Sequence, residues 1–136
     1  MSITVEEFRR LAKPKRHKYN VSAKEDREFD GKIYDSRAEM ERAKHWRTML
    51  ESGSVQAVFE QVRMSLGIRE NIYVADFLIV AHGNVFAEDV KGTETPAFRK
   101  VKKLWQRYGR LPLCVVKYDY KKRTFKTTEI ISGPPC

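Results

Sequence analysis

Two aspartates and a lysine stand in an otherwise apolar stretch, "IYVADFLIVAHGNVFAEDVKG", residues 72–92. Asp76 interrupts the first apolar run, and Asp89 and Lys91 lie two residues apart in the second. Burying a carboxylate without partners costs several kcal/mol, and two carboxylates close together repel each other. We therefore expect a cation at this point of the fold, and the identity of that cation decides the chemistry.

A tight turn centred on Gly83 and Asn84 is predicted to join the two runs as antiparallel strands. This turn would bring Asp76 opposite residue 90 or 91. Because side chains alternate between the two faces of a strand, Asp89 and Lys91 share one face. The three charged side chains then converge if the faces match.

A divalent ion is one way to balance these carboxylates, since Lys91 offers only one positive charge. Mg²⁺ or Mn²⁺ prefers oxygen ligands, here Asp76, Asp89 and the backbone carbonyl of Val90. Mg²⁺ held by few protein ligands keeps its waters, coordinates phosphate oxygens and lowers the pKa of a bound water. The alternative is a buried Asp–Lys ion pair, with the other aspartate at a solvent-facing end of its strand and no metal.

Glu39 is a third candidate acid. It falls in the first turn of a predicted helix, about residues 36–51, on the same stripe as Ala43 and Trp46. One interpretation is a capping box with Ser36, and the other is a third metal ligand that faces the same sheet. The helix pattern leaves both interpretations open.

The net charge of +9 is large for 136 residues, and its clustering indicates a polyanionic partner. Residues 9–18 and 96–110 are rich in Lys and Arg and contain no acid, and a third basic group lies within 117–126. An ordinary solubilising surface is the alternative, and an anionic membrane is disfavoured because no basic face accompanies a broad apolar one. The candidate nucleic-acid contacts are Lys15, Arg16, Arg99, Lys100, Lys102, Lys103, Lys121, Lys122 and Arg123.

The acids, the metal, Lys91 and the basic segments together describe hydrolysis of a phosphodiester bond in DNA or RNA. The element order predicts one domain of α/β (α+β) class, with a mixed sheet and helices against it. Residues 72–81 are apolar on both faces, which is typical of a strand covered on each side. A turn is predicted at residues 30–31, strands in 54–68, 72–82, 85–92, 112–120 and 124–131, and helices over 36–51 and from Pro96 to Gly109.

The ends of the chain are expected to differ from its middle. Residues 1–20 are predicted to form a basic, flexible N-terminal arm, 21–131 the domain, and 132–136 a short tail. Cys114 and Cys136 fit neither a disulfide framework nor a zinc site. No stretch reaches the ~20 apolar residues of a membrane span, and no secretory signal begins the chain, so we expect a cytoplasmic protein.

The histidines and tyrosines add little to the assignment. His17 and His45 are expected on the surface and His82 in the turn, since no acids accompany them at ligand spacing. Tyr118 and Tyr120 lie beside the basic segment 121–123. They are candidates for stacking on bases or a sugar, although exposed aromatic residues are common on sheets.

The ordered set of residues resembles the PD-(D/E)XK nuclease superfamily: Glu39 on a first helix, Ala75-Asp76 in a strand, and Asp89-Val90-Lys91 in the next strand. Ala75 stands where the superfamily pattern has Pro. More closely, "KYN" (18–20), "DGKIYDSRAE" (30–39), "ADF" (75–77), "EDVKG" (88–92) and "FRKVKKLW" (98–105) resemble a small phage and prophage family grouped with Holliday-junction resolvase-like nucleases. The resemblance covers roughly residues 18–118.

This resemblance implies a restriction-endonuclease-like core, in the order α-β-β-β-α-β with an extra C-terminal strand. It implies that Asp76 and Asp89 hold Mg²⁺ or Mn²⁺, that Glu39 joins them directly or through water, and that Lys91 is the catalytic lysine. Lys100 and Lys102 would contact phosphates.

The implied activity is a Mg²⁺- or Mn²⁺-dependent endodeoxyribonuclease of phage or prophage origin that acts on branched DNA in the host cytoplasm. A homodimer is implied as well, because symmetric cleavage of a four-way junction needs two sites related by a two-fold axis. Two alternatives stay open. One is a DNA-binding or inhibitory phage protein with weak or no cleavage, and the other is a nicking or repair endonuclease on linear DNA.

Overall fold

The computed structural model describes residues 22–135. The predicted basic arm at 1–20, including Lys15 and Arg16, therefore lies outside the described residues. The chain divides into two compact units, Met1–Met40 and Glu41–Cys136, and each unit is described separately below. The expected division into arm, domain and tail stays a prediction.

In the first unit a short hairpin precedes the first long helix. Asp30 and Gly31 form its turn with φ of 52° and 78°, which confirms the predicted turn. Positive φ at both central residues suits a two-residue hairpin turn, because its twist then matches that of the strands. The elements are the 3-10 helix η1 (Lys24–Arg27), β1 (Glu28–Phe29) and β2 (Lys32–Ile33).

Helix α2 (Arg37–Glu51) begins at a side-chain cap. The Ser36 Oγ accepts a hydrogen bond from the backbone N–H of Glu39 at 3.0 Å. This bond satisfies one of the N–H groups that a helix leaves unpaired at its start. The predicted N-terminal bound of the helix and the capping role of Ser36 are thereby confirmed.

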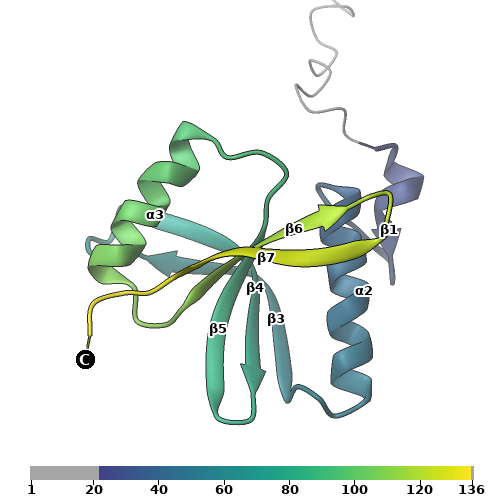
Figure 1. Cartoon of the computed structure of the whole chain (residues 1–136), viewed down its shortest axis with the longest axis horizontal. Coiled ribbons are helices and arrows are strands. Elements are labelled where there is room, and N and C mark those ends of the chain that lie inside the picture. The colour runs from purple at the N-terminus through teal and green to yellow at the C-terminus, as the bar shows by residue number, and fades with distance from the viewer. Residues whose placement is uncertain (1–21, 136) are drawn as a thin grey trace, which may run out of the picture. The chain divides into compact units, whose positions relative to one another are not determined.

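The second unit is built around a five-stranded mixed sheet in the order β3-β4-β5-β6-β7 (Figure 1). Neighbouring strands are antiparallel except for the parallel pair β5–β6. This arrangement confirms the predicted α/β class and element order. The elements are β3 (Ala57–Ser65), β4 (Ile72–Ala81), β5 (Asn84–Val90), α3 (Pro96–Tyr108), β6 (Leu113–Asp119) and β7 (Thr124–Ile131).

Helix α3 connects β5 to β6, and local signals set both of its ends. The Thr95 side chain accepts a hydrogen bond from Phe98 N at 3.1 Å, and Pro96 occupies the first turn. At the other end Gly109 N donates to Trp105 O at 2.7 Å. Parallel strands need such a crossover, so α3 is the reason that β5 and β6 run in the same direction.

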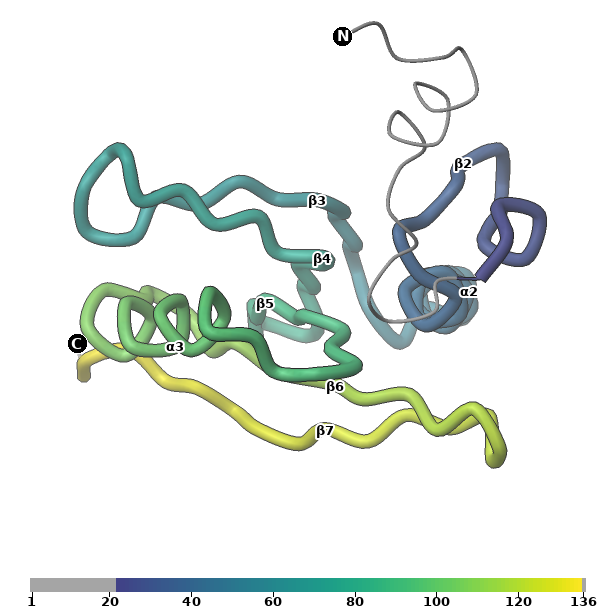
Figure 2. The backbone as a smooth tube through the Cα atoms, turned by 90° about the horizontal axis from the view of Figure 1, so that it is seen from above, coloured from purple at the N-terminus to yellow at the C-terminus, as the bar shows by residue number. Residues whose placement is uncertain are grey.

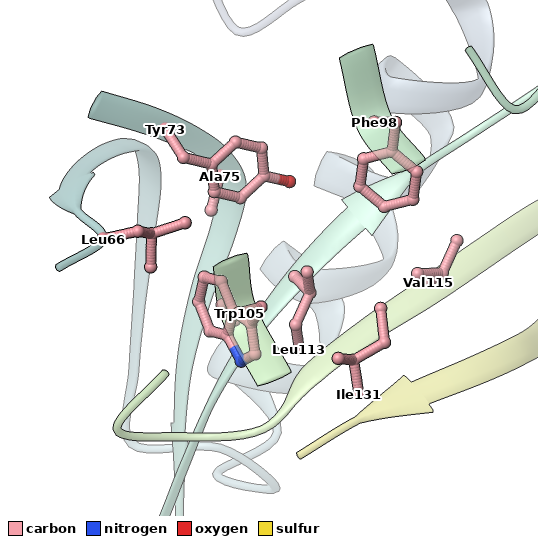
Figure 3. Packing of buried hydrophobic residues seen from close by; sticks show 9 residues of the cluster. Leu66, Tyr73, Ala75, Phe98, Trp105, Leu113, Val115 and Ile131 are labelled. Atoms are coloured by element: carbon pink, nitrogen blue, oxygen red, sulfur yellow. The ribbon is translucent and has the colours of Figure 1, made fainter. Parts of the chain in front are cut away.

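The main hydrophobic core surrounds α3. Seen from above, the helix lies between the β3–β4 pair and the β6–β7 pair (Figure 2). Its Phe98 and Trp105 contribute to one buried cluster with residues of both pairs (Figure 3). This packing holds the N-terminal half of β4 against α3. The cluster comprises Leu66, Tyr73, Ala75, Ala87, Phe98, Trp105, Leu113, Val115 and Ile131.

Strand β4 is fully covered on one face only. Its odd-numbered residues from 73 to 79 are at most 9% exposed, whereas Ile72 and Val74 are 48% and 40% exposed. The expected cover on both faces is therefore wrong for the first half of the strand, because α3 packs on the odd-numbered side. Asp76 belongs to the even-numbered side and is half-buried, which leaves it accessible to solvent.

The turn between β4 and β5 lies one residue earlier than predicted. His82 and Gly83 are the turn residues, with φ of 47° and 85°, and Asn84 already pairs in β5. The sequence "HGN" is ambiguous because His, Asn and Gly all tolerate positive φ. The resulting register puts Asp76 opposite Asp89, one step beyond the last paired residues, and not opposite residue 90 or 91.

Candidate active site

The β4–β5 ladder ends where the two aspartates begin. Its last pair is Phe77 with Glu88, and beyond it side chains take over from backbone pairing. Asp76 N donates to Asp89 Oδ1 at 3.2 Å, and Val90 N donates to Asp76 Oδ2 at 2.8 Å. Each carboxylate thus binds the backbone of the opposite strand. The structure brings Asp76 and Asp89 together at the point where β4 leaves β5 to follow α3.

Lys91 lies beside this pair. Its Nζ is 2.9 Å from Asp89 Oδ2 and 4.6 Å from the centre of the Phe98 ring. Its backbone N–H donates to Val116 O at 2.9 Å, which attaches this end of the strand to β6. The Lys91 side chain is 34% exposed, whereas that of Asp89 is 1% exposed. The ammonium can therefore meet a ligand from solvent while it neutralises a buried carboxylate.

The Lys91 ammonium pairs with Asp89, and the second carboxylate, that of Asp76, lies half-exposed beside them. Moreover, the Asp89 Oδ2 has no well-aligned hydrogen bond within residues 22–135, although it is buried. A buried oxygen of this kind is a ready ligand for a cation.

Asp76 and Asp89 fit a Mg²⁺ or Mn²⁺ ion in donor type. Mg²⁺ is usually held by one or two carboxylates and retains several waters. The part of the chain that the structure describes contains no group of three His, Cys, Asp or Glu side chains arranged to hold a metal. A site with two carboxylates and water is compatible with that finding.

Tyr73 adds a buried hydroxyl to the site. The residue is 9% exposed, and its hydroxyl points toward Phe98 (Figure 3). Burial raises the pKa of Tyr73 far above its ordinary value, and the nearby negative charge of Asp89 raises it further. A hydrogen bond to Asp89 also contributes to the raised pKa, although its geometry is not well aligned, and the hydroxyl keeps its proton. No pattern in the sequence distinguished this tyrosine from a core residue.

Tyr73→Phe is expected to leave the free energy of unfolding unchanged or to raise it by up to about 1 kcal/mol. The reason is that a buried donor with a poorly aligned hydrogen bond stabilises the folded state little, and Phe keeps the ring while removing that donor. Urea denaturation measures the change, with Tyr108→Phe on α3 as the control. A loss of more than about 1 kcal/mol would show instead that the hydroxyl donates to Asp89 in solution.

Glu88 neighbours Asp89 but takes part in a different cluster. It is 1% exposed and accepts hydrogen bonds from Arg42 Nε at 2.6 Å, Arg42 Nη2 at 2.7 Å and Trp46 Nε1 at 2.9 Å. A bidentate Arg–carboxylate pair satisfies most of the hydrogen-bonding capacity of both groups. Because side chains alternate along β5, Glu88 faces α2, whereas Asp89 lies on the opposite face of the sheet and contacts Lys91.

Arg42 is a residue that sequence reasoning missed. Its guanidinium carbon lies 4.7 Å from the ring centres of both Trp46 and Phe125. The available signal was the spacing of four residues between Arg42 and Trp46, which puts an arginine on the buried stripe of the helix. A buried acid in the sheet, Glu88, was the matching signal.

Two titratable groups near this cluster stay neutral. Burial lowers the pKa of His45 below 6.5, and the positive charge of Arg42 lowers it further. His45 is half-buried with its ring 4.8 Å from that of Trp46, so its expected surface position is corrected. Burial and then the charge of Glu88 raise the pKa of the Cys114 thiol. Neither group is prepared to act as a charged ligand or nucleophile.

Glu39 belongs to the first unit, Met1–Met40. Its backbone N–H binds the Ser36 cap, and its side chain is half-buried. The capping interpretation therefore accounts for its backbone. The role of its carboxylate as a ligand beside Asp76 and Asp89 stays a prediction.

The candidate DNA contacts on α3 differ in availability. Arg99, Lys100 and Lys103 are exposed. The Lys102 ammonium instead lies between the carboxylates of Glu94 and Glu129, 3.1 Å from the latter. Its hydrogen bond with Glu94 is the main cause that raises its pKa. A phosphate at Lys102 would have to displace these carboxylates, so we expect it to contribute less than its neighbours.

The basic residues at the β6–β7 turn, Lys121, Lys122 and Arg123, are all exposed.

No protein-family model matches the chain, and no curated protein matches it. Within residues 22–135, no helix is long and apolar enough to cross a membrane.

Proposed function

We propose that this protein is a Mg²⁺- or Mn²⁺-dependent DNA endonuclease of the PD-(D/E)XK type. The observation that carries the proposal is the interlocked pair Asp76–Asp89 with Lys91 on Asp89, at the point where two strands diverge. Here a second carboxylate is held against the first by backbone hydrogen bonds, at a half-exposed position.

In this proposal Asp76, Asp89 and the Val90 carbonyl hold the ion, and Glu39 joins them directly or through water. The bound ion would polarise the scissile phosphate and lower the pKa of a coordinated water. Asp89 holds the Lys91 ammonium at the edge of the site. From there Lys91 can donate a hydrogen bond to a phosphate oxygen or to the attacking water, and its charge stabilises the negative charge that develops during hydrolysis.

The substrate in this proposal is branched or otherwise structured DNA, as in Holliday-junction resolvases, and the protein acts as a homodimer. The exposed cations on α3 and at the β6–β7 turn support a DNA partner, because they offer charge to phosphates along a duplex. The homodimer follows from the two-fold symmetry of a four-way junction. A phage-encoded enzyme of this kind would act in the cytoplasm of the host.

One observation favours a second function, a DNA-binding or inhibitory phage protein that cleaves weakly or not at all. The Lys91 ammonium already lies 2.9 Å from Asp89 Oδ2, so it neutralises a carboxylate that a metal would need. The two functions, and nicking of linear DNA, are separated by one assay. Pure protein is incubated with four-way junction, flap, linear duplex and single-stranded DNA, with Mg²⁺, with Mn²⁺ or with EDTA.

Metal-dependent cutting of the junction or flap, lost in Lys91→Ala and kept in the exposed control Arg69→Ala, is the expected result. Binding without metal-dependent cutting would establish the second function. Cutting confined to linear duplex would replace the resolvase-like proposal with nicking or repair. Cutting that survives Lys91→Ala would mean that the site lies elsewhere.

The exposed cations of α3 are expected to make duplex binding steeply dependent on salt. Arg99→Ala combined with Lys100→Ala should reduce the slope of log K against log[salt] by about 1.8, since each lost phosphate contact removes ~0.9. Binding is measured by fluorescence anisotropy in EDTA over a salt series. Arg69→Ala, a cation in the loop before β4, is the control. An unchanged slope in the double variant would remove α3 from the DNA surface.

A further inference from the structure

An exposed tyrosine stands in the most basic turn of the described chain. Tyr120 is 57% exposed and lies between β6 and β7. Asp119 before it and Glu129 in β7 are the only acids between residues 113 and 131. The cations around it, all exposed, are Lys117, Lys121, Lys122, Arg123 and Lys126.

The ring of Tyr120 packs against a buried aromatic residue. It meets the ring of Tyr118 edge-on, with centroids 4.9 Å apart and planes at 81°. Tyr118 is 8% exposed, and the centre of its ring lies 4.7 Å from the centre of the Phe125 ring. The guanidinium carbon of Arg42 lies 4.7 Å from the centre of the same Phe125 ring. Arg42 is fixed by its pair with Glu88. An unbroken series of contacts therefore runs from β5 to Tyr120, so little entropy is lost when a ligand stacks on its ring.

The turn itself has a defined conformation. The Asp119 Oδ1 accepts hydrogen bonds from Lys121 N at 2.9 Å and Lys122 N at 3.1 Å. Arg123 closes the turn with φ of 53°. A side chain that binds the backbone two residues on is the usual way in which Asp stabilises a turn. The lysines are thus presented from a fixed backbone, next to the aromatic ring.

The register of the sheet sets the distance from this turn to the candidate active site. Asp89 pairs with Val115, and Lys91 N binds Val116 O. Tyr120 lies four residues farther along the chain, about 13 Å at ~3.3 Å per strand residue. This length corresponds to roughly four base steps of ~3.4 Å. Strand alternation places Tyr118 and Tyr120 on the side of the sheet where Arg42 binds Glu88, whereas Asp89 faces the other side. A DNA strand with a phosphate at the site would therefore reach Tyr120 around the end of β6, and four base steps are the minimum separation.

We propose that the β6–β7 turn binds unpaired DNA, with a base stacked on Tyr120 and the flanking phosphates on Lys121, Lys122 and Arg123. Aromatic rings among cations are the recognition elements of single-stranded nucleic acid, since every base offers a face for stacking. A duplex keeps its bases stacked on one another and would use only the cations. The contribution of this turn to cleavage rests on the proposed function: the turn would favour DNA that has unpaired nucleotides several bases away from the cut.

The test uses the full chain in EDTA, so that binding is measured without cleavage. A single-stranded oligodeoxynucleotide carries 2-aminopurine, whose fluorescence is quenched when it stacks. Tyr120→Ala is expected to weaken binding roughly 5- to 150-fold and to abolish the quenching, as for loss of one stacked base. Tyr120→Phe should behave like the unmodified protein. Phe59→Ala, which removes an aromatic ring that is 51% exposed on edge strand β3, is the matched control.

The cations are tested separately from the ring. Lys121→Ala combined with Lys122→Ala should reduce the salt slope for single strands by about 1.4, because each contact contributes ~0.7, whereas Tyr120→Ala should leave this slope unchanged. Equal binding by Tyr120→Ala and the unmodified protein would overturn the proposal, as would tighter binding of single-stranded RNA than of DNA. If these binding results hold but no metal-dependent cutting is seen, the turn is retained and the nuclease function is lost.

Discussion

An Asp89→Asn protein is expected to lose metal-dependent cleavage by roughly 10²- to 10³-fold while it stays folded. Asn keeps the side-chain oxygen that accepts the hydrogen bond from Asp76 N, so the contact between β4 and β5 persists. The substitution removes one of two adjacent negative charges and therefore also removes their repulsion. Lys91 loses its partner, but its side chain is 34% exposed and can be solvated.

Two measurements separate the loss of chemistry from the loss of fold. The cleavage rate is measured on a four-way junction with Mn²⁺, and thermal unfolding is followed with and without Mn²⁺. A metal that binds only the folded state adds about 2.7 kcal/mol at a concentration 100 times its Kd, and Asp89→Asn should lose this increment. Glu51→Gln, which removes an exposed carboxylate at the end of α2, is the control. Full cleavage by Asp89→Asn would contradict the assignment of this site.

Glu88→Ala is expected to lower the free energy of unfolding by about 3–5 kcal/mol, the largest stability effect that we predict. The substitution leaves the Arg42 guanidinium buried without a counter-charge, and Trp46 Nε1 loses its acceptor. An unpaired buried charge costs far more than the pair contributes. Because Phe125 packs on Arg42, the base of the β6–β7 turn should loosen as well.

A double-mutant cycle in urea denaturation checks this explanation. Arg42→Met combined with Glu88→Leu replaces both charges with apolar groups and should recover most of the loss. The control pair is Glu41 and Lys44 on the surface of α2, 3.8 Å apart, where Glu41→Ala should cost less than about 0.5 kcal/mol. A small effect of Glu88→Ala, similar to that control, would show that the pair is solvated.

Many elements of this protein could be predicted from local pattern. The Asp30-Gly31 turn, the Ser36 cap, and the bounds of α3 between Pro96 and Gly109 depend on the backbone preferences of single residues and their nearest neighbours. The strands followed from apolar alternation. Even the meeting of Asp76 with Asp89 could be predicted, because a hairpin with a short turn leaves few possible registers.

The contacts that distinguish this protein could not be read in the same way. The position of the β4–β5 turn depends on which residues of "HGN" take positive φ. The pairing of β4 with β5 over the whole length of the hairpin decides which residues do so. Glu88 meets Arg42 across 46 residues, and Lys102 meets Glu129 across 27. The chain contains many acids, and the sequence around each cation does not identify which of them becomes its partner.

Packing around α3 explains the remaining difference. Helix α3 packs on Tyr73 and Ala75 of β4, the ladder with β5 ends at Phe77, and Asp76 lies half-exposed beside a buried Asp89. Periodicity along the chain tells which side chains share a face, because that depends only on backbone geometry. The free energy of the whole packed structure decides which faces become buried and which charges meet there. Residues far apart in the sequence contribute to that free energy as much as neighbouring residues do.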